Sequence, residues 1–275
     1  MASELGARIG QGAFADVHVW APGQVVKLFR PGFPNLSIRH EARVTRALHV
    51  AGAPCAEVFE ELTLDDRCGF VMSHLEGPTL LQLSRSGEVP HHETGAILAG
   101  LALAVHQIPP PREIPTLQVY MRAALKMPLG KVPGLVPSDL IAYVDALPRE
   151  DGLCHVDLHP GNVIMTPEGP RLVDWGGAVR APAAYDLAVC QVLLWELIPE
   201  MVEDPQRPRS VHEALRSEYG HRSGLSATAM TQAVEPFLPV VRLHALLSGA
   251  WPKQRDYLSR AVETMATRSG SQGGL

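Results

Sequence analysis

The sequence predicts an α+β protein of two lobes, with a small antiparallel β-sheet and one helix in the first and a larger, mainly helical second lobe. The first quarter of the chain alternates apolar and polar residues in short runs separated by turn signals, whereas the remainder repeats apolar residues at helical spacing. Between them, the stretch EGPT at 76–79 interrupts both patterns with Gly and Pro. We therefore expect lobes at 1–76 and 77–267 and a disordered tail at 268–275.

The first lobe is expected to hold its strands and helix in the order β-β-β-α-β-β. A helix fits residues 36–50, because Gly52 and Pro54 follow its apolar repeat and end it. The turns APGQ and DDR separate neighbouring strands. The strands are predicted at 5–9, 14–20, 25–29, 57–64 and 68–75.

The second lobe is expected to be helical apart from one hairpin. Two short apolar runs, 162–165 and 171–173, flank the turn TPEGP and predict this hairpin. The helices are predicted at 80–84, 93–107, 116–126, 138–146, 184–197, 211–219 and over most of 226–267.

Composition and charge exclude several classes of protein. The chain of 275 residues carries a net charge of −5, which argues against nucleic acid as its main partner because phosphate binding needs a basic face. Four cysteines without CxxC spacing are predicted to be buried thiols of a reducing compartment. With no signal-peptide pattern and no apolar run long enough to span a bilayer, we expect a cytoplasmic protein without a membrane partner. No pattern indicates its oligomeric state.

Three polar residues gather around the predicted hairpin. Antiparallel pairing brings Asn162, at the start of one strand, close to Asp174, at the end of the other. Oxygen ligands at few positions suit Mg²⁺, and Asp157, in the preceding loop, is then free to accept a proton from a hydroxyl group. The alternative is a polar turn whose side chains only cap local backbone groups.

The first lobe adds a glycine-rich loop and a strand lysine. Gly10 and Gly12 lie between the first two strands and allow the backbone to approach phosphates closely. The loop has Ala15 at the position of the third glycine of the common kinase loop. A strand follows them, which argues against a dinucleotide-binding motif. Lys27, in the third strand, and Glu41, in the helix, are the next candidates; the alternative for each is a solvated surface position.

The pattern His155-x-Asp157-x-x-x-x-Asn162, followed by Asp174, resembles the catalytic and metal-binding segments of the protein-kinase-like fold. Within that fold, the chain from residue 10 to about 189 resembles the aminoglycoside phosphotransferase and choline kinase-like family. The likeness is strongest at HVDLHPGN, LVDWGG and YDLA. The chain departs from the family at Val156, where a small residue is common, and at the stretch APA at 181–183, where the family usually has Gly-Asp-Pro.

The resemblance implies a nucleotide-binding first lobe and a catalytic and substrate-binding second lobe. It makes Asp157 the catalytic base, assigns Mg²⁺ to Asn162 and Asp174, and gives His155 and Asp186 supporting roles in the catalytic loop. The stretch FVMSHLEG is similar to the family's adenine-binding strand and hinge. The residues implied in nucleotide binding are Gly10, Gly12, Lys27, Glu41, Ser73 and Leu75.

The function that the resemblance implies is transfer of the γ-phosphoryl group of ATP or GTP to a hydroxyl of a small molecule, with Mg²⁺. The acceptor is expected to be an aminoglycoside-like compound, an amino alcohol, a sugar or another small metabolite. One alternative is an atypical protein kinase, although YDLA opens a helix too soon after Asp174 to leave room for an activation segment. A catalytically silent nucleotide-binding module is the other.

The charge of the second lobe bears on the acceptor. From residue 91 onward we count 19 acidic and 16 basic residues, a slight excess, whereas a polycationic acceptor favours a markedly acidic lobe. Acidic residues that could still gather around such an acceptor are Glu200, Glu203, Asp204 and Glu235.

Overall fold

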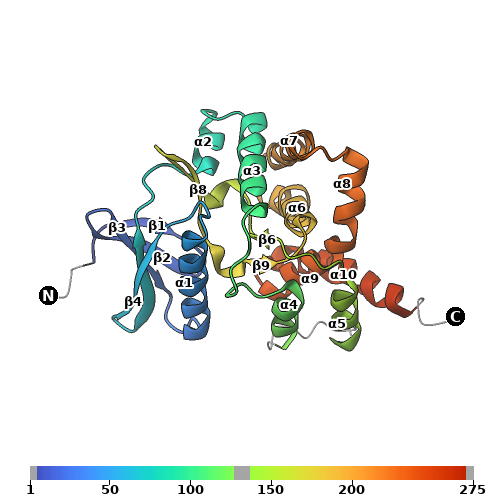
Figure 1. Ribbon diagram of the computed structural model, residues 1–275, viewed down its shortest axis with the longest axis horizontal. Coiled ribbons are helices and arrows are strands. Elements are labelled where there is room, and N and C mark those ends of the chain that lie inside the picture. Colours follow the sequence, from blue (N-terminus) through green and yellow to red (C-terminus); the bar gives the residue numbers. More distant parts are fainter. Residues whose placement is uncertain (1–4, 127–136, 271–275) are drawn as a thin grey trace.

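A five-stranded antiparallel sheet forms most of the first lobe in the computed structural model, which describes residues 5–126 and 137–270 (Figure 1). Its strand order is β1-β2-β3-β5-β4, and α1 (Asn35–Val50) lies between β3 and β4 in the chain, as predicted. The strands are β1 (Arg8–Gln11), β2 (Ala15–Ala21), β3 (Gln24–Phe29), β4 (Val58–Leu64) and β5 (Arg67–Ser73).

The period-two alternation of β3 decides where Lys27 points. Val26 and Leu28 are buried on the outer face of the sheet, so Lys27 shares the other face with Phe29. That face packs on α1, in a cluster that includes Phe29 and Ile38. Lys27 therefore points toward the helix rather than into bulk water.

The second lobe is built around one continuous apolar core, with α7 packed along α3 (Figure 1). Helices occur close to each predicted position, which confirms the α+β class. They are α2 (Leu80–Ser86), α3 (His91–His106), α4 (Leu117–Lys126), α5 (Pro137–Ala146), α6 (Ala183–Gln191), α7 (Gln206–Ser223), α8 (Ala227–Val234), α9 (Leu238–Ser248) and α10 (Arg255–Gly270).

Three details of this lobe differ from the sequence prediction. A second two-stranded ladder pairs β6 (Leu153–Cys154) with β9 (Val179–Arg180), in addition to the predicted hairpin of β7 (Val163–Thr166) and β8 (Gly169–Leu172). The helix predicted at 184–197 changes after α6 into a π-helical segment, Val192–Leu197. Helix α10 continues to Gly270, so residues 268–270 of the predicted disordered tail are helical, and the rest of that tail lies outside the described residues.

The hinge between the lobes is fixed to the β7–β8 hairpin. The N–H of Met165 donates to the carbonyl of Pro78 (2.9 Å), and Thr79 bridges to Ile164. Gly77 has a φ of 147°, and a Cβ added there would lie 2.0 Å from the carbonyl oxygen of Met165. Only glycine allows this approach of the two backbones.

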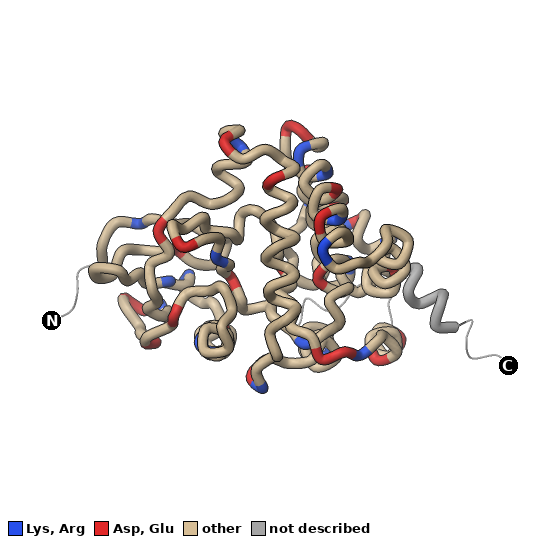
Figure 2. Tube along the Cα trace, turned by 45° about the horizontal axis from the view of Figure 1, so that its top comes forward, with Lys and Arg blue, Asp and Glu red and all other residues tan. Residues whose placement is uncertain are grey.

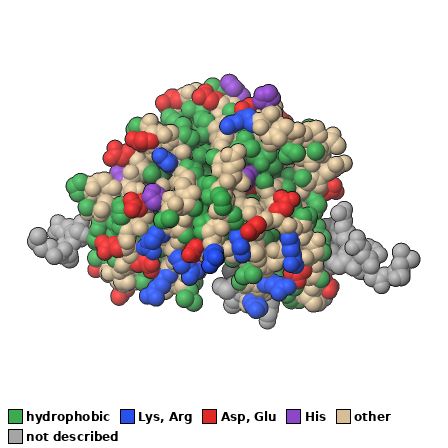
Figure 3. Space-filling view, in the orientation of Figure 1, with side chains coloured by type: hydrophobic (Ala, Val, Ile, Leu, Met, Phe, Trp, Pro, Cys, Tyr) green, Lys and Arg blue, Asp and Glu red, His purple; other side chains and the backbone are tan. Residues whose placement is uncertain are grey.

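Charged residues of both signs are interspersed along the chain trace (Figure 2). On the face shown in Figure 3, basic side chains gather along the lower edge, over α1 and α4, with acidic ones between them. Within residues 5–126 and 137–270, no helix combines the length and the apolar character that crossing a membrane requires.

We expect Gly77→Ala to destabilise the protein by about 2 kcal/mol or more, because the new Cβ collides with the carbonyl of Met165 and the backbone leaves its preferred region. Urea denaturation measures this. Gly87→Ala is the control, since Gly87 also has a positive φ, of 82°, but nothing lies within 4 Å of its added Cβ. It should cost only about 1 kcal/mol. Equal losses in the two variants would contradict the hinge contact.

Candidate active site

The predicted site residues of both lobes line one cavity of about 1590 Å³. A single small ligand usually occupies a pocket of roughly 300–1,000 Å³, so this cavity has room for two. The predicted residues that line it are Gly10, Gly12, Lys27, Glu41, Ser73, Leu75, Asp157, Asn162 and Asp174.

Lys27 joins the two lobes across this cavity. Its ammonium donates to Glu41 Oε1 at 2.6 Å and also binds a carboxylate oxygen of Asp174. The Lys27 and Glu41 side chains are only 12% and 14% exposed, so neither is a solvated surface position. Burial alone would lower the pKa of Lys27, but Glu41 and Asp174 outweigh it and raise that pKa.

The two carboxylates beside Lys27 differ in environment. Burial raises the pKa of Glu41 despite the opposing charge of Lys27. Asp174 has a half-exposed side chain, and there Lys27 outweighs the effect of burial and lowers the pKa. Gly176 lets Glu41 come this close, since a Cβ added to Gly176 would lie 3.1 Å from Glu41 Oε2. Lys27 therefore stays protonated and Asp174 stays ionised at neutral pH.

The glycine-rich loop is held from outside the cavity by Arg30. Its guanidinium donates to the carbonyls of Ala13 (2.9 Å) and Gly12 (3.0 Å). The N–H of Gly12 donates to the carbonyl of Ala15 (2.8 Å), which closes a tight turn. The loop is thus fixed over the cavity through its carbonyl groups.

The hinge end of the cavity presents free backbone groups. No described residue hydrogen-bonds the backbone N–H or C=O of Leu75, which lines the cavity. Ser73 is held beside it, because its N–H donates to the carbonyl of Glu57 (2.9 Å) and its hydroxyl accepts from the Glu57 N–H (3.0 Å). An aromatic base can therefore bond the backbone at Leu75.

Asp157 presents its carboxylate to the cavity from the catalytic loop. Its side chain is 48% exposed, and its Oδ2 accepts from Asn162 Nδ2 at 2.8 Å. The other hydrogen of that amide binds the Asp157 carbonyl at 2.9 Å. His159 Nε2 lies 3.7 Å from Asp157 Oδ1. Asn162 thus fixes one oxygen of the carboxylate and leaves the other facing the cavity.

The loop that carries Asp157 is braced by Asp186, as expected from the resemblance. The fully buried Asp186 carboxylate accepts from the N–H groups of His155 (2.9 Å) and Val156 (2.7 Å), and His106 Nε2 lies 3.2 Å away. Val156 has a φ of 72°, a conformation that β-branched residues rarely adopt. The two hydrogen bonds hold this turn.

His155 uses both ring nitrogens to link two segments of the site. Its Nδ1 accepts from the N–H of Asp157 at 3.2 Å, so the other nitrogen, Nε2, carries the proton and donates to the carbonyl of Val173 at 3.0 Å. Its ring packs on Trp175, with centroids 4.4 Å apart. Burial lowers the pKa of His155. The neutral imidazole thus links the loop of Asp157 to Val173, which lies between β8 and Asp174.

The donor groups of Asn162 and Asp174 fit Mg²⁺. The carbonyl of Asn162 accepts from the Val173 N–H at 3.0 Å, which places Asn162 beside the residue that precedes Asp174. Both amide hydrogens of Asn162 are used by Asp157, while its Oδ1 has no donor among the described residues. An amide oxygen and a half-exposed carboxylate form the oxygen-only set that Mg²⁺ prefers.

A second cluster of metal-ligating side chains is structural. Ligand atoms of His106, Cys154 and Asp186 lie within 4.8 Å of one another. They are occupied, because Asp186 and His106 bind each other and the Cys154 thiol donates to the carbonyls of Ala181 and Pro182. None of the three lines the cavity.

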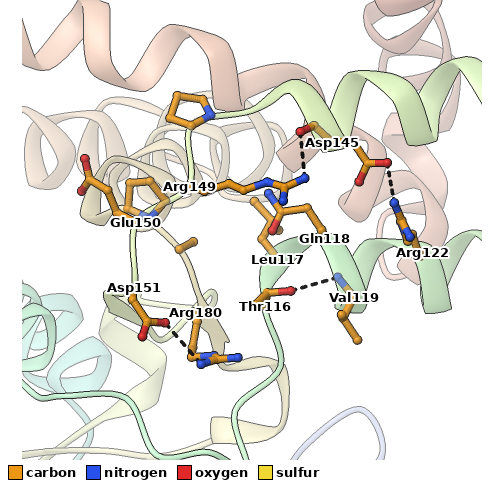
Figure 4. Close-up of a pocket in the computed structure, with 13 residues that line it drawn as sticks. Thr116, Leu117, Gln118, Val119, Arg122, Asp145, Arg149, Glu150, Asp151 and Arg180 are labelled. Atoms are coloured by element: carbon orange, nitrogen blue, oxygen red, sulfur yellow. Dashed lines mark hydrogen bonds and ion pairs between the residues drawn. The ribbon is translucent and has the colours of Figure 1, made fainter.

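A smaller cavity of about 420 Å³ lies between α4 and the segment after α5 (Figure 4). Two ion pairs lie in its lining: Arg122 binds Asp145, and Arg180 lies 3.4 Å from Asp151. It contains none of the predicted site residues. The larger cavity is therefore the candidate active site.

Among the residues of the larger cavity that were not predicted are His159, Tyr120 and His244. His159 lies inside the motif HVDLHPGN, whose two histidines at fixed spacing could have indicated it. Tyr120, from α4, and His244, from α9, meet with Tyr120 Oη 3.0 Å from His244 Nε2. They are 124 positions apart in the chain, and no local pattern joins them.

Comparison with known proteins agrees with this geometry. Residues 8–225 match the sequence model of a phosphotransferase enzyme family. No curated protein sequence matches the chain.

Solved structures share the fold. One is a choline/ethanolamine kinase family protein from Mesorhizobium loti, with a TM-score of 0.60, 15% identity, and coverage of 98% of this chain and 88% of that one. Another is an aminoglycoside-3'-phosphotransferase of type VIII, with a TM-score of 0.57 and 22% identity. The match covers 85% of this chain and 93% of that one. A third is a ternary complex of the phosphotransferase APH(2")-IIa with streptomycin and ATP, with a TM-score of 0.57 and 15% identity. The match covers 96% of this chain and 93% of that one.

We expect Asp186→Ala to destabilise the protein by about 3 kcal/mol, because two buried N–H groups lose their acceptor. Thermal or urea unfolding measures the loss. Asp151→Ala is the matched control: Asp151 is 72% exposed and pairs with Arg180 at the surface, so its loss should cost less than about 1 kcal/mol. Similar values for the two variants would show that Asp186 does not brace the loop.

Proposed function

This chain belongs to the phosphotransferase enzyme family, and we propose that it transfers the γ-phosphoryl group of ATP or GTP to a hydroxyl group of a small molecule with Mg²⁺. One observation carries the proposal: the ammonium of Lys27 and the carboxylates of Asp157 and Asp174 come from separate segments and line a single cavity. The ATP bound to the structurally similar streptomycin complex supports a nucleoside triphosphate as the donor.

The first lobe binds the nucleotide in this proposal. The adenine or guanine base bonds the free backbone groups at Leu75, beside Ser73. The loop of Gly10 and Gly12 covers the phosphates. Lys27 binds their oxygens, and Glu41 keeps the ammonium aimed into the cavity.

The second lobe supplies the metal ligands and the base. Asn162 and Asp174 hold Mg²⁺, which when bound offsets negative charge on the phosphate groups. The free oxygen of Asp157 orients the acceptor hydroxyl and takes its proton as the new P–O bond forms and the bond to the β-phosphate oxygen breaks. Lys27 stabilises the charge that develops.

A small acceptor fits better than a protein. Strand β9 ends at Arg180 and α6 begins at Ala183, which leaves no length for an activation segment after Asp174. Two features argue against a catalytically silent nucleotide-binding module. The buried Asp186 braces the loop of Asp157, and Lys27, Asp157 and Asp174 are all present in the cavity. A screen of nucleotide consumption over hydroxylated compounds with Mg²⁺ tests the proposal, and nucleotide turnover that no acceptor stimulates would contradict it.

We expect Asp157→Asn to lower kcat by about 10²-fold or more, because the amide cannot accept the proton of the hydroxyl. ATP should still bind with unchanged affinity, since Asp157 does not hold the nucleotide. Steady-state kinetics and calorimetry measure the two effects. Asp151→Asn, outside this cavity, is the control. Full turnover in Asp157→Asn would remove this residue from its assigned role.

We expect Asp174→Ala to abolish the dependence of nucleotide binding on Mg²⁺, because a metal ligand is lost. Calorimetric titration of ATP with and without Mg²⁺ measures the dependence, with Asp151→Ala as the control. If Mg²⁺ strengthens ATP binding equally in the variant and the unchanged protein, Asp174 is not a ligand.

A further inference from the structure

The part of the cavity that α6, the π-helical segment and α9 enclose has an apolar wall. The π-helical segment places Leu193 and Leu197 on this wall, and α9 contributes Val241 and Ala245. Trp251 adds a large aromatic surface just after α9. Segments of π-helix often occur at functional sites, because the wider turn redirects side chains. Helix α6, which precedes the π-helical segment, contacts the catalytic loop, because the Cys190 thiol donates to the carbonyl of Leu158 at 3.5 Å.

Tyr120 and His244 form a polar pair within this region. Tyr120 Oη lies 3.0 Å from His244 Nε2, and both side chains line the cavity. Burial raises the pKa of Tyr120 to about 12 and lowers the pKa of His244. The negative charge of Asp157, which lines the same cavity, raises both pKa values, although burial outweighs it at His244. Near neutral pH the pair is therefore uncharged and offers hydrogen bonds only.

Asp157 is the acid that the described residues place on this side of the cavity. Among the described residues, the other acids that line the cavity are Glu41 and Asp174, which bind Lys27, and Glu88, which lies beside α2 and accepts from Ser86. Glu196, within the π-helical segment, does not line it, and Arg242 binds both of its oxygens.

The acids considered from the sequence as contacts for a polycation are also absent from the described cavity lining; they are Glu200, Glu203, Asp204 and Glu235. A polycation placed against an apolar wall would lose its hydration without gaining carboxylate partners. An uncharged apolar molecule gains from the same burial.

We propose that the acceptor is an uncharged, mainly apolar alcohol that packs against Leu193, Val241 and Trp251 while Tyr120 and His244 hydrogen-bond one of its oxygens. This inference rests on the proposed function, because it assigns the acceptor of the same site. It separates this chain from enzymes that bind an acceptor through several carboxylates.

The first test compares acceptors of different charge at equal concentration. Borneol and naphthylethanol are the uncharged apolar probes, choline is a monocation and gentamicin is a polycation. We expect kcat/KM for the apolar alcohols to exceed that for gentamicin at least tenfold. A higher kcat/KM for gentamicin or choline would overturn the inference and leave the proposed function standing.

The second test measures binding without turnover. Borneol should quench or shift the fluorescence of Trp251, and Trp251→Phe should remove that signal. Ala245→Asp puts a charge on the wall and should weaken borneol binding at least tenfold, whereas Ala142→Asp, on an exposed position of α5, should not. Absence of borneol binding, or equal weakening in both variants, would overturn the inference. Because this test needs no turnover, its result is separate from the test of the proposed function.

The third test addresses the polar pair. Tyr120→Phe should raise the KM of the apolar acceptor about tenfold, while the ATP affinity and the unfolding midpoint stay close to those of the unchanged protein. A purely structural role for Tyr120 would lower the unfolding midpoint and leave the acceptor KM unchanged, which would remove the pair from the proposal.

Discussion

The buried carboxylate of Asp186 is the constraint on which the catalytic loop depends. It binds two successive backbone N–H groups, at His155 and Val156, and so holds a β-branched residue in the left-handed region directly before Asp157. Such a turn persists only where its surroundings over-determine it. The Asp157 carboxylate owes its position to a residue in α6 that does not line the cavity. The backbone before Asp157 is fixed, while the side chain of Asp157 is exposed to the cavity. A preorganised site requires this arrangement.

Two kinds of support meet at this loop. Below it, the neutral ring of His155 joins the loop to the strand before Asp174, and Trp175 packs on that ring. Across the cavity, Lys27 reaches Asp174 from a strand of the other lobe. The contacts of His155 lie within the second lobe. The contact of Lys27 with Asp174 joins the two lobes, so it depends on how the hinge at Gly77 orients them. The site therefore relies on rigid packing within a lobe and on charge between the lobes.

Short contiguous patterns made much of this site predictable from the sequence. Asp157, Asn162 and Asp174 lie around one hairpin, whose pairing follows from two apolar runs and a strong turn. Strand alternation places Lys27 on the face that packs on α1, but its contact with Asp174 depends on how the two lobes meet. Strands β6 and β9 have two residues each, too few to show a period. A π-helical turn cannot be told from an α-helix over so short a segment, and the meeting of Tyr120 with His244 depends on the packing of α4 against α9.

The shared ammonium of Lys27 has a thermodynamic consequence. Lys27 and Asp174 form an ion pair. A ligand that binds one of them therefore changes the free energy of ligand binding at the other. A cation at Asp174 releases the ammonium for an anion, and an anion at Lys27 releases the carboxylate for a cation. Linkage makes this reinforcement reciprocal, so ligands of opposite charge enter the cleft cooperatively, and either one alone must displace an existing ion pair.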